Sequence, residues 1–206
     1  MSDAETFITA NLRLKPGPAV PEIQLYSGHP ASGLGRLGET PPYWAYHWAG
    51  GTVLARYVLD HPDSVAGLRV VDLGTGSGLV AIAAVRAGAA QVQAFDIDPY
   101  AIAAAELNAA ANQVAFTVSC RDILDKPPPE ADLILVGDLF YDAETARRVT
   151  GFLDRCAEVG TKALVGDPGR AWLPVDRLES LAEYTIPDFA TGPAPARVYA
   201  WVSAGT

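Results

Sequence analysis

The sequence predicts an α/β fold of the Rossmann-like kind, with a seven-stranded, mostly parallel sheet, an antiparallel edge strand and helices on both faces. A short apolar strand over 70–73 runs directly into a glycine-rich loop, and a helical pattern begins at Leu79. Strand, glycine loop and helix form the first unit of a nucleotide-binding sheet. Strand and helix patterns then alternate along the rest of the chain, with neither an internal repeat nor a long linker.

The segment before this unit has its own pattern. A short amphipathic helix is predicted over 4–13, and three nearby prolines then keep the backbone extended. Residues 22–26 alternate like a strand, and 27–42 are rich in glycine, proline and serine, as loops are. A helix is predicted over 52–61, following Gly50 and Gly51.

The elements after the glycine loop complete the predicted sheet. Asp98 and Pro99 stand where an N-cap and a first helical residue belong. Strands are predicted over 91–96, 114–118, 131–136 and 161–165, helices over 100–112, 143–159 and 175–182, and a closing antiparallel hairpin from 184–186 and 198–202. We expect a single domain over 1–206, in which 1–48 form an N-terminal extension with an aromatic segment and 49–206 form the core.

Composition excludes several classes of protein. The 206 residues carry 15 basic and 24 acidic side chains, a net charge of −9, with no cluster of lysine or arginine. Nucleic acid is therefore not expected as a partner. No run approaches the ~20 apolar residues of a membrane span, and no signal peptide is apparent. Cys120 and Cys156 match no metal spacing. We expect a cytoplasmic monomer without a bound metal.

The spacing of the glycine loop predicts its ligand. Gly74-x-Gly76-x-Gly78 departs from the G-x-G-x-x-G of dinucleotide sites, and Asp72 precedes it by two residues. A carboxylate there would repel a pyrophosphate but attract a cation. S-adenosylmethionine, with an amino-acid tail and a sulfonium centre, suits the loop better. The candidate cofactor-binding residues are Asp72, Gly74, Thr75, Gly76 and Gly78.

A second acid follows at the end of the next predicted strand. Asp96 closes that strand 22 residues after Gly74, where an acid commonly accepts hydrogen bonds from both hydroxyls of a ribose. We assign Asp96 and its neighbour Ile97 to the cofactor, and Asp98 to capping the following helix.

An aromatic segment precedes the core. Tyr43, Trp44, Tyr46 and Trp48 fall within six positions. The segment can be a lid that packs on the sheet, or a wall of the site where an amine meets the sulfonium, because aromatic faces attract cations. Both roles can hold at once. We interpret His47 as a polar neighbour in this segment, not as a catalytic base.

The candidate acceptor residues follow the predicted strand 131–136. Asp138 and Tyr141 place an acid and an aromatic hydroxyl after it, at the carboxyl edge where ligands bind in open α/β sheets.

The glycine loop resembles motif I of the class I S-adenosylmethionine-dependent methyltransferases. Three further motifs occur together: Pro-Pro-Tyr-Trp-Ala-x-x-Trp-Ala-Gly-Gly from position 41, Gly-Asp-Leu-Phe-Tyr from 137, and Gly-Asp-Pro-Gly-Arg from 166. This combination resembles the lysine methyltransferases of the electron-transfer flavoprotein β subunit, whose bacterial relatives often carry the label nicotinamide N-methyltransferase-like.

The resemblance implies a function and roles for individual residues. It implies methyl transfer from S-adenosylmethionine, giving S-adenosylhomocysteine, to a lysine of a protein substrate. Asp138 and Tyr141 match a D-x-x-Y signature and would orient the target lysine as catalytic residues. Asp122 would hold the adenine amino group, with the backbone of Ile123 at the ring, although Asp122 can also simply form a turn. The acceptor-side wall would contain Trp44, Trp48 and Phe140, with Trp48 also at the cofactor.

Three other functions remain open from the sequence. A small-molecule N-methyltransferase acting on a nicotinamide-like amine would share the cofactor site. A non-catalytic cofactor-binding or partner-binding module is disfavoured by the acids Asp72, Asp96 and Asp138. A nicotinamide-dependent oxidoreductase is disfavoured by the glycine spacing.

Overall fold

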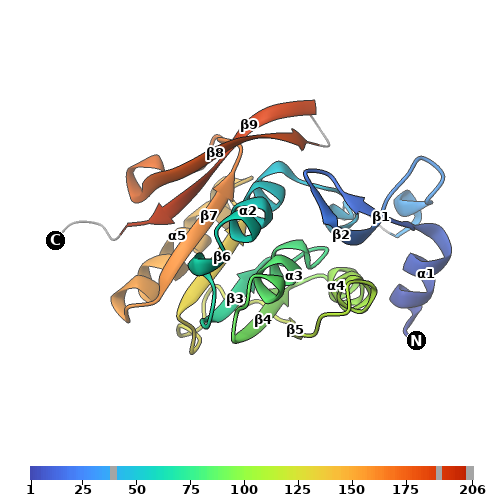
Figure 1. Cartoon of the computed structure of the whole chain (residues 1–206), viewed down its shortest axis with the longest axis horizontal. Coiled ribbons are helices and arrows are strands. Elements are labelled where there is room, and N and C mark those ends of the chain that lie inside the picture. The colour runs from blue at the N-terminus through green and yellow to red at the C-terminus, as the bar shows by residue number, and fades with distance from the viewer. Residues whose placement is uncertain (38–40, 189–191, 203–206) are drawn as a thin grey trace.

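A computed structural model describes residues 1–37, 41–188 and 192–202, and its centre is a seven-stranded sheet in the order β5-β4-β3-β6-β7-β9-β8 (Figure 1). Neighbouring pairs from β5 to β7 are parallel, whereas β9 runs antiparallel to both β7 and β8. This topology confirms the predicted fold class. The strands are β3 (Arg69–Leu73), β4 (Gln91–Asp96), β5 (Thr117–Cys120), β6 (Leu133–Gly137), β7 (Lys162–Asp167), β8 (Leu178–Asp188) and β9 (Gly192–Trp201).

Helices cover both faces of the sheet because its central strands are apolar on both sides. Alternate residues of β3 point to opposite faces: Val70 packs with α2 (Ala49–Asp60) and α3 (Leu79–Arg86), and Val71 packs with α5 (Ala143–Glu158). The helix α4 (Pro99–Ala111) lies beside α3, on the same face.

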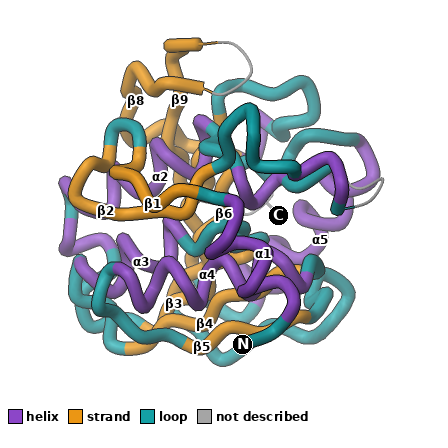
Figure 2. The backbone as a smooth tube through the Cα atoms, turned by 90° about the vertical axis from the view of Figure 1, so that its right-hand side faces the viewer, coloured by secondary structure: helices purple, strands orange, loops and turns teal. Residues whose placement is uncertain are grey.

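The N-terminal segment forms a separate layer over that face. After α1 (Asp3–Asn11), β1 (Arg13–Gly17) and β2 (Val20–Ser27) pair as an antiparallel hairpin. Figure 2 shows α3 and α4 between this hairpin and strands β3 to β5. The helix α1 packs on α4, and its N-cap Ser2 forms a capping box with Glu5.

Two buried asparagines, one within α4 and one at its C-cap, dock the hairpin on the core. Asn112 accepts a hydrogen bond from the amide of Gln24 at 2.9 Å and donates to its carbonyl at 2.6 Å. Asn108 accepts from the amide of Tyr26 at 2.8 Å and donates to the carbonyl of Ser77 in the glycine loop at 2.8 Å. The two side chains thus satisfy backbone amides and a carbonyl of β2 that would otherwise lack a partner strand.

One predicted element is wrong. Residues 175–182 were expected to form a helix, but only Val175–Arg177 are helical, as a single 3-10 turn, and β8 begins at Leu178. Pairing with β9, in the register Leu178↔Trp201, decides the conformation. A bulge between Ser180 and Ala182 disturbs the two-residue alternation that would have indicated a strand.

Other differences are shifts of boundaries. The third core strand covers Thr117–Cys120, whereas 114–118 was predicted, and α2 begins at Ala49, so that Gly50 and Gly51 belong to its first turn. The remaining short elements are the 3-10 turns Leu34–Arg36, Tyr43–Ala45 and Pro62–Ser64. Among the described residues, no helix is both long and apolar enough to cross a membrane.

Candidate functional site

The candidate site lies at the carboxyl ends of the parallel strands. The strand order changes direction between β3 and β6, because β4 and β5 continue to one side and β7 to the other. Loops that leave adjacent strands toward opposite sides open a crevice at such a point, where ligands of open α/β sheets bind. The loops that follow β3, β4, β5 and β6 carry most of the predicted site residues.

The glycine loop after β3 adopts a left-handed backbone. Gly74, Gly76 and Gly78 have φ angles of +67°, +52° and +79°, a region that favours residues without a Cβ. The amide of Gly76 donates to the Asp96 carboxylate at 2.9 Å, which fastens the loop to the end of β4. Gly78 is the N-cap of α3 and packs against Ala105, so that its role is close packing.

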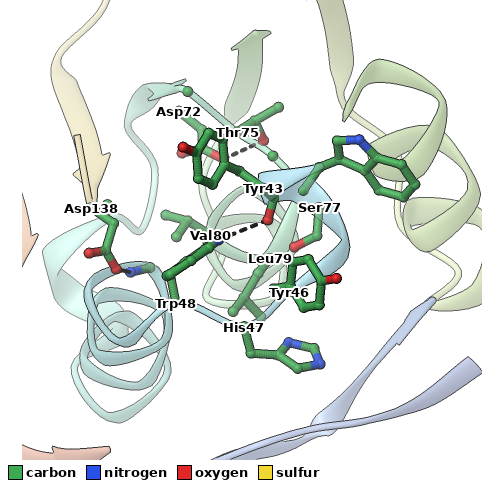
Figure 3. Close-up of a pocket in the computed structure, with 15 residues that line it drawn as sticks. Tyr43, Tyr46, His47, Trp48, Asp72, Thr75, Ser77, Leu79, Val80 and Asp138 are labelled. Carbon is green, nitrogen blue, oxygen red and sulfur yellow. Dashed lines mark hydrogen bonds between the residues drawn. The ribbon is translucent and has the colours of Figure 1, made fainter. Parts of the chain in front are cut away.

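Asp72 lies buried beneath this loop, with 2% of its surface exposed. Its Oδ2 accepts from the hydroxyl of Thr75 at 2.6 Å (Figure 3) and also from the amide of Ala81 at 3.1 Å. Burial raises the pKa of Asp72 to about 7, against the effect of these two hydrogen bonds. Asp72 therefore supports the loop and also borders a small cavity beneath the aromatic segment.

Asp96 is held in place by backbone donors. The amides of Gly76 and Asp98 donate to its two oxygens at 2.9 and 3.0 Å. Each carboxylate oxygen has a second lone pair, and Asp96 borders the main cavity. Burial raises its pKa. Asp98 accepts from the amide of Tyr100 as the N-cap of α4, which confirms the capping role predicted for it.

One cavity of about 550 Å³ connects these residues with the candidate acceptor residues. Its volume falls within the range of small-molecule and cofactor sites. The predicted site residues that line it are Trp44, Trp48, Gly74, Gly76, Asp96, Ile97, Asp122, Asp138 and Tyr141. Residues from the two groups of predictions, cofactor and acceptor, therefore share one space.

The aromatic segment both packs on the core and borders this cavity, as the two interpretations of it, a lid and a wall, require. Trp44 is 4% exposed, stacks on Tyr100 of α4 and borders the cavity. The indole NH of Trp48 donates to the Tyr43 carbonyl at 2.8 Å, and Tyr43 stacks on Tyr141, with ring centroids 6.0 Å apart. The segment is thus both packed on the core and a wall of the cavity.

His47 turns toward the N-terminal hairpin. Its Nε2 lies 2.9 Å from the hydroxyl of Ser27, and burial lowers its pKa. Figure 3 shows its ring pointing away from Asp138, which agrees with the role of polar neighbour predicted for it.

Asp138 connects three elements at the acceptor end. It has a left-handed φ of +59°, and its amide donates to the carbonyl of Gly166 at 3.0 Å. Its Oδ2 accepts from the amides of Gly50 and Gly51 in the first turn of α2, where the helix dipole favours a negative charge. Its Oδ1 pairs with the guanidinium of Arg170.

Arg170 lies between an acid and an aromatic ring. Its Nε donates to Asp138 at 2.6 Å, and its guanidinium carbon lies 5.8 Å from the centre of the Trp48 ring. The loop that carries Arg170 is fixed by Asp167, whose Oδ1 accepts from the amides of Gly169 and Arg170, each at 2.7 Å. Asp167 is fully buried, which raises its pKa to about 6.

Phe140 is a correction to the predicted site. It was expected on the acceptor-side wall, but its side chain is 0% exposed and packs with the core cluster around α5. In the D-x-x-Y segment, successive residues point in different directions: Asp138 and Tyr141 border the cavity, and Phe140 anchors the segment beneath it.

The predicted adenine residues differ from each other. Asp122 borders the cavity and pairs with Arg148 at 2.7 Å. The side chain of Ile123 is buried in the core, the role predicted for its backbone at the adenine ring stays a prediction, and the next residue, Leu124, borders the cavity. Asp122 also accepts from the Leu124 amide at 3.0 Å, so the turn-forming role left open for it is present as well.

Sequence reasoning gave no role to several residues that border the cavity. Arg170 belongs to a motif that was noted, but its pair with Asp138 joins residues 32 positions apart and gives no local signal. Two other cavity residues also depend on partners that are distant in the sequence. Arg121 lies over the ring of Phe95, and Arg148 pairs with Asp122. Long-range ion pairs become visible only when the fold brings their partners together.

Comparison with known proteins identifies the family. The family model described as ribosomal protein L11 methyltransferase (PrmA) matches residues 51–137. The electron transfer flavoprotein β-subunit lysine methyltransferase of Xenopus laevis is 40% identical over 194 residues, which cover 89% of this chain and 79% of that protein. The chain belongs to the electron transfer flavoprotein β-subunit lysine methyltransferase family. This confirms the family predicted from the sequence.

A further relative agrees with this membership, and a solved structure shares the fold. The family member of Rattus norvegicus is 43% identical over 153 residues, which cover 71% of this chain and 60% of the rat protein. The chain thus spans less than two thirds of that relative. The crystal structure of magnesium protoporphyrin IX methyltransferase from Synechocystis with bound S-adenosylmethionine has a TM-score of 0.53 at 17% identity, covering 74% of this chain and 77% of that one. At this identity the similarity shows the fold alone.

Proposed function

We propose that this protein is an S-adenosylmethionine-dependent N-methyltransferase that methylates a lysine side chain of a protein, with the electron-transfer flavoprotein β subunit as the first candidate. The proposal takes 1–206 as one catalytic domain whose aromatic segment borders both substrates. The observation that carries it is the single cavity in which the glycine loop and Asp96 meet Asp138 and Tyr141.

The residues of the cavity fit the methyl donor. The glycine loop brings backbone close to the ligand, and Asp96 has lone pairs left for the two ribose hydroxyls. The loop itself contains no basic side chain, and Asp72 lies beneath it. This charge distribution suits a sulfonium and an amino group and opposes a pyrophosphate. The donor, when bound, supplies an electrophilic methyl group.

The acceptor end must position a neutral amine in line with that methyl group. A lysine with an ordinary pKa near ~10.4 is mostly protonated at pH 7, and neutralising it costs roughly 4 to 5 kcal/mol. Burial against Trp48 and Tyr141 would lower this cost by disfavouring the charged form. Asp138 and the Tyr141 hydroxyl would fix the nitrogen, and proximity would supply most of the rate.

A protein substrate is favoured over a small amine by the rim of the cavity. Tyr43 and Tyr141 stack on each other there, and 51% and 49% of their surfaces are exposed. Aromatic side chains that border a cavity and also face solvent can contact a macromolecule while one of its side chains enters. An enzyme that methylates a small metabolite would enclose its acceptor instead.

The test is methyl transfer in a defined mixture. The protein is incubated with S-adenosylmethionine and either purified electron-transfer flavoprotein or nicotinamide, and products are measured by intact mass and peptide mapping. We expect increments of one methyl group on lysine of the β subunit, and none with Tyr141→Ala, which removes the hydroxyl and the stacked ring. Methylated nicotinamide with an unmodified β subunit would refute the proposal.

A further inference from the structure

Both oxygens of the Asp138 carboxylate are paired with groups of this chain, and Asp138 still borders the cavity. One oxygen accepts from the first turn of α2, and the other accepts from two nitrogens of Arg170. The side chain of Asp138 is 9% exposed, whereas that of Arg170 is 27% exposed and borders the cavity. Any cation that entered the cavity would therefore meet a neutralised acid.

This arrangement bears on the protonation of an acceptor lysine. An unpaired carboxylate within ~4–6 Å of an ammonium raises the pKa of that ammonium by roughly 1–3 units. Only the neutral amine has the lone pair that can attack a methyl group. An acid that orients the nitrogen would thus oppose the reaction, unless another positive charge balanced it.

We propose that Arg170 is a positioning residue that neutralises Asp138, so that Asp138 can orient the target lysine without holding it in its protonated form. The inference rests on the proposed function. In the transfer step the deprotonated lysine nitrogen forms a bond to the methyl carbon, the sulfur–carbon bond breaks, and its electron pair remains on sulfur. The proton has been released to solvent beforehand.

The surroundings of Arg170 support a fixed position. Asp167 holds the backbone of its loop at two amides, and the Trp48 ring lies against the guanidinium. A lysine in place of this arginine would keep the charge but lose the fork that gives two nitrogens to one acid.

Other charged or titratable groups face the pair from neighbouring elements. From β7 Asp167 adds a buried negative charge: burial raises its pKa to about 6, the Arg170 amide opposes this rise, and the charge of Asp138 adds to it. From β3 Asp72 borders the small cavity that Asp138 also borders. Tyr43 and Tyr141 border the main cavity. The donors from α2 are backbone amides, which do not titrate in this range.

The first test compares pH profiles. Single-turnover methylation of the lysine substrate, at saturating donor and substrate, is measured from pH 6 to 10 for the wild type, Arg170→Gln and Arg170→Lys. We expect the acid limb of Arg170→Gln to move upward by about one pH unit or more, because the bound lysine then faces an unpaired acid. Arg170→Lys should stay within about 0.3 unit of the wild type, with a lower plateau. S-adenosylhomocysteine binding by calorimetry verifies that each variant is folded.

Two results would overturn the proposal. An Arg170→Gln rate that is reduced equally at every pH would mean that Arg170 has a structural role alone. A rate increased at every pH would mean that Arg170 competes with the lysine for Asp138.

A second test needs no turnover and separates this inference from the proposed function. The pKa of the Asp138 carboxyl is measured by carbon NMR of protein labelled at the aspartate carboxyl carbon, with Asp138→Asn to assign the signal. We expect the pKa in Arg170→Gln to lie at least about one unit above that of the wild type. An unchanged pKa would refute the pairing even if the wild type methylates lysine, and a raised pKa would support it even if no lysine substrate is found.

Discussion

Buried carboxylates dominate the chemistry of individual residues at this site. Asp72 and Asp167 are 2% and 0% exposed, and burial raises their pKa values to about 7 and about 6. Charged groups of this kind are costly to bury without a counter-ion. Asp72 has two hydrogen-bond donors and, among the described residues, no cationic partner, so a positively charged ligand in the cavity would favour its ionised form.

The raised pKa of Asp72 predicts an unusual dependence of stability on pH. Its folded pKa exceeds the ordinary value of 3.8, so the folded state keeps a proton that the unfolded state releases. The free energy of unfolding should therefore fall as pH rises from about 4 to 7. Asp72→Asn can keep both hydrogen bonds by placing its amide oxygen at the position of Oδ2. We expect the variant to gain about 2–4 kcal/mol relative to the wild type across this window, from ~1.4 kcal/mol per pKa unit.

Urea denaturation of both proteins without ligand, at pH 4.5, 6 and 7.5, measures this difference. Asp167 remains in both proteins, so its contribution cancels in the comparison. Parallel stability curves for wild type and variant would contradict the raised pKa of Asp72.

At the scale of elements, the first turn of α2 fits closely against two strand ends. A Cβ on Gly50 would lie 2.3 Å from the carbonyl oxygen of Gly166 and 2.7 Å from Oδ2 of Asp138. A Cβ on Gly137 would lie 2.7 Å from the Cα of Gly51. These glycines let the amides of α2 approach the Asp138 carboxylate, and thus place the helix at the acceptor end of the cavity.

This packing predicts opposite outcomes for adjacent glycines. Gly50→Ala should destabilise the protein by about 1–3 kcal/mol, because backbone atoms cannot move aside easily. Gly51→Ala is the matched control: no described atom lies within 4 Å of its Cβ, and alanine improves helix propensity by up to ~1 kcal/mol. Thermal unfolding of both variants measures the contrast. Equal tolerance of the two substitutions would mean that α2 does not pack in this way.

Elements were predicted where local patterns decide and missed where distant partners decide. The helix of 143–159 has a clear apolar stripe and an Asp142 cap, and it appears as α5 (Ala143–Glu158). The segment 178–182 has an ambiguous local pattern, and its pairing with β9 makes it a strand. In the same way, Asp138 and Tyr141 were predictable from their position after a strand, but Arg170 acquires its role from an ion pair that only the fold forms.

At the scale of the whole molecule, the N-terminal layer is connected to the glycine loop. Asn108 of α4 is 0% exposed and joins the Tyr26 amide of β2 to the Ser77 carbonyl of the loop. The mostly parallel sheet with an antiparallel edge was predictable from the alternating elements, and the place of the site from the rule that ligands bind at strand ends. The docking of β2 by asparagine side chains could not be predicted, because an asparagine in a predicted helix gives no sign of a distant strand.

Asn108→Ala tests the connection between the layers. It leaves the Tyr26 amide and the Ser77 carbonyl without this partner, and buried unpaired groups cost about 1–3 kcal/mol each. We expect lower stability and faster hydrogen exchange across β2 and the glycine loop. Glu106→Ala, at an exposed position of the same helix, should change stability by no more than about 0.5 kcal/mol. Unchanged exchange in β2 would contradict the docking role of Asn108.

The central claim is that the cavity at the carboxyl edge of the sheet binds a positively charged, adenosine-bearing methyl donor through the glycine loop and Asp96. Calorimetric titration with S-adenosylhomocysteine and with NAD tests it most directly. We predict that S-adenosylhomocysteine binds and NAD does not, that Asp96→Ala weakens binding by about 10-fold or more through the loss of charge-assisted hydrogen bonds, and that Asp98→Ala changes it only a few-fold. Binding of NAD by a protein that ignores S-adenosylhomocysteine would contradict the account.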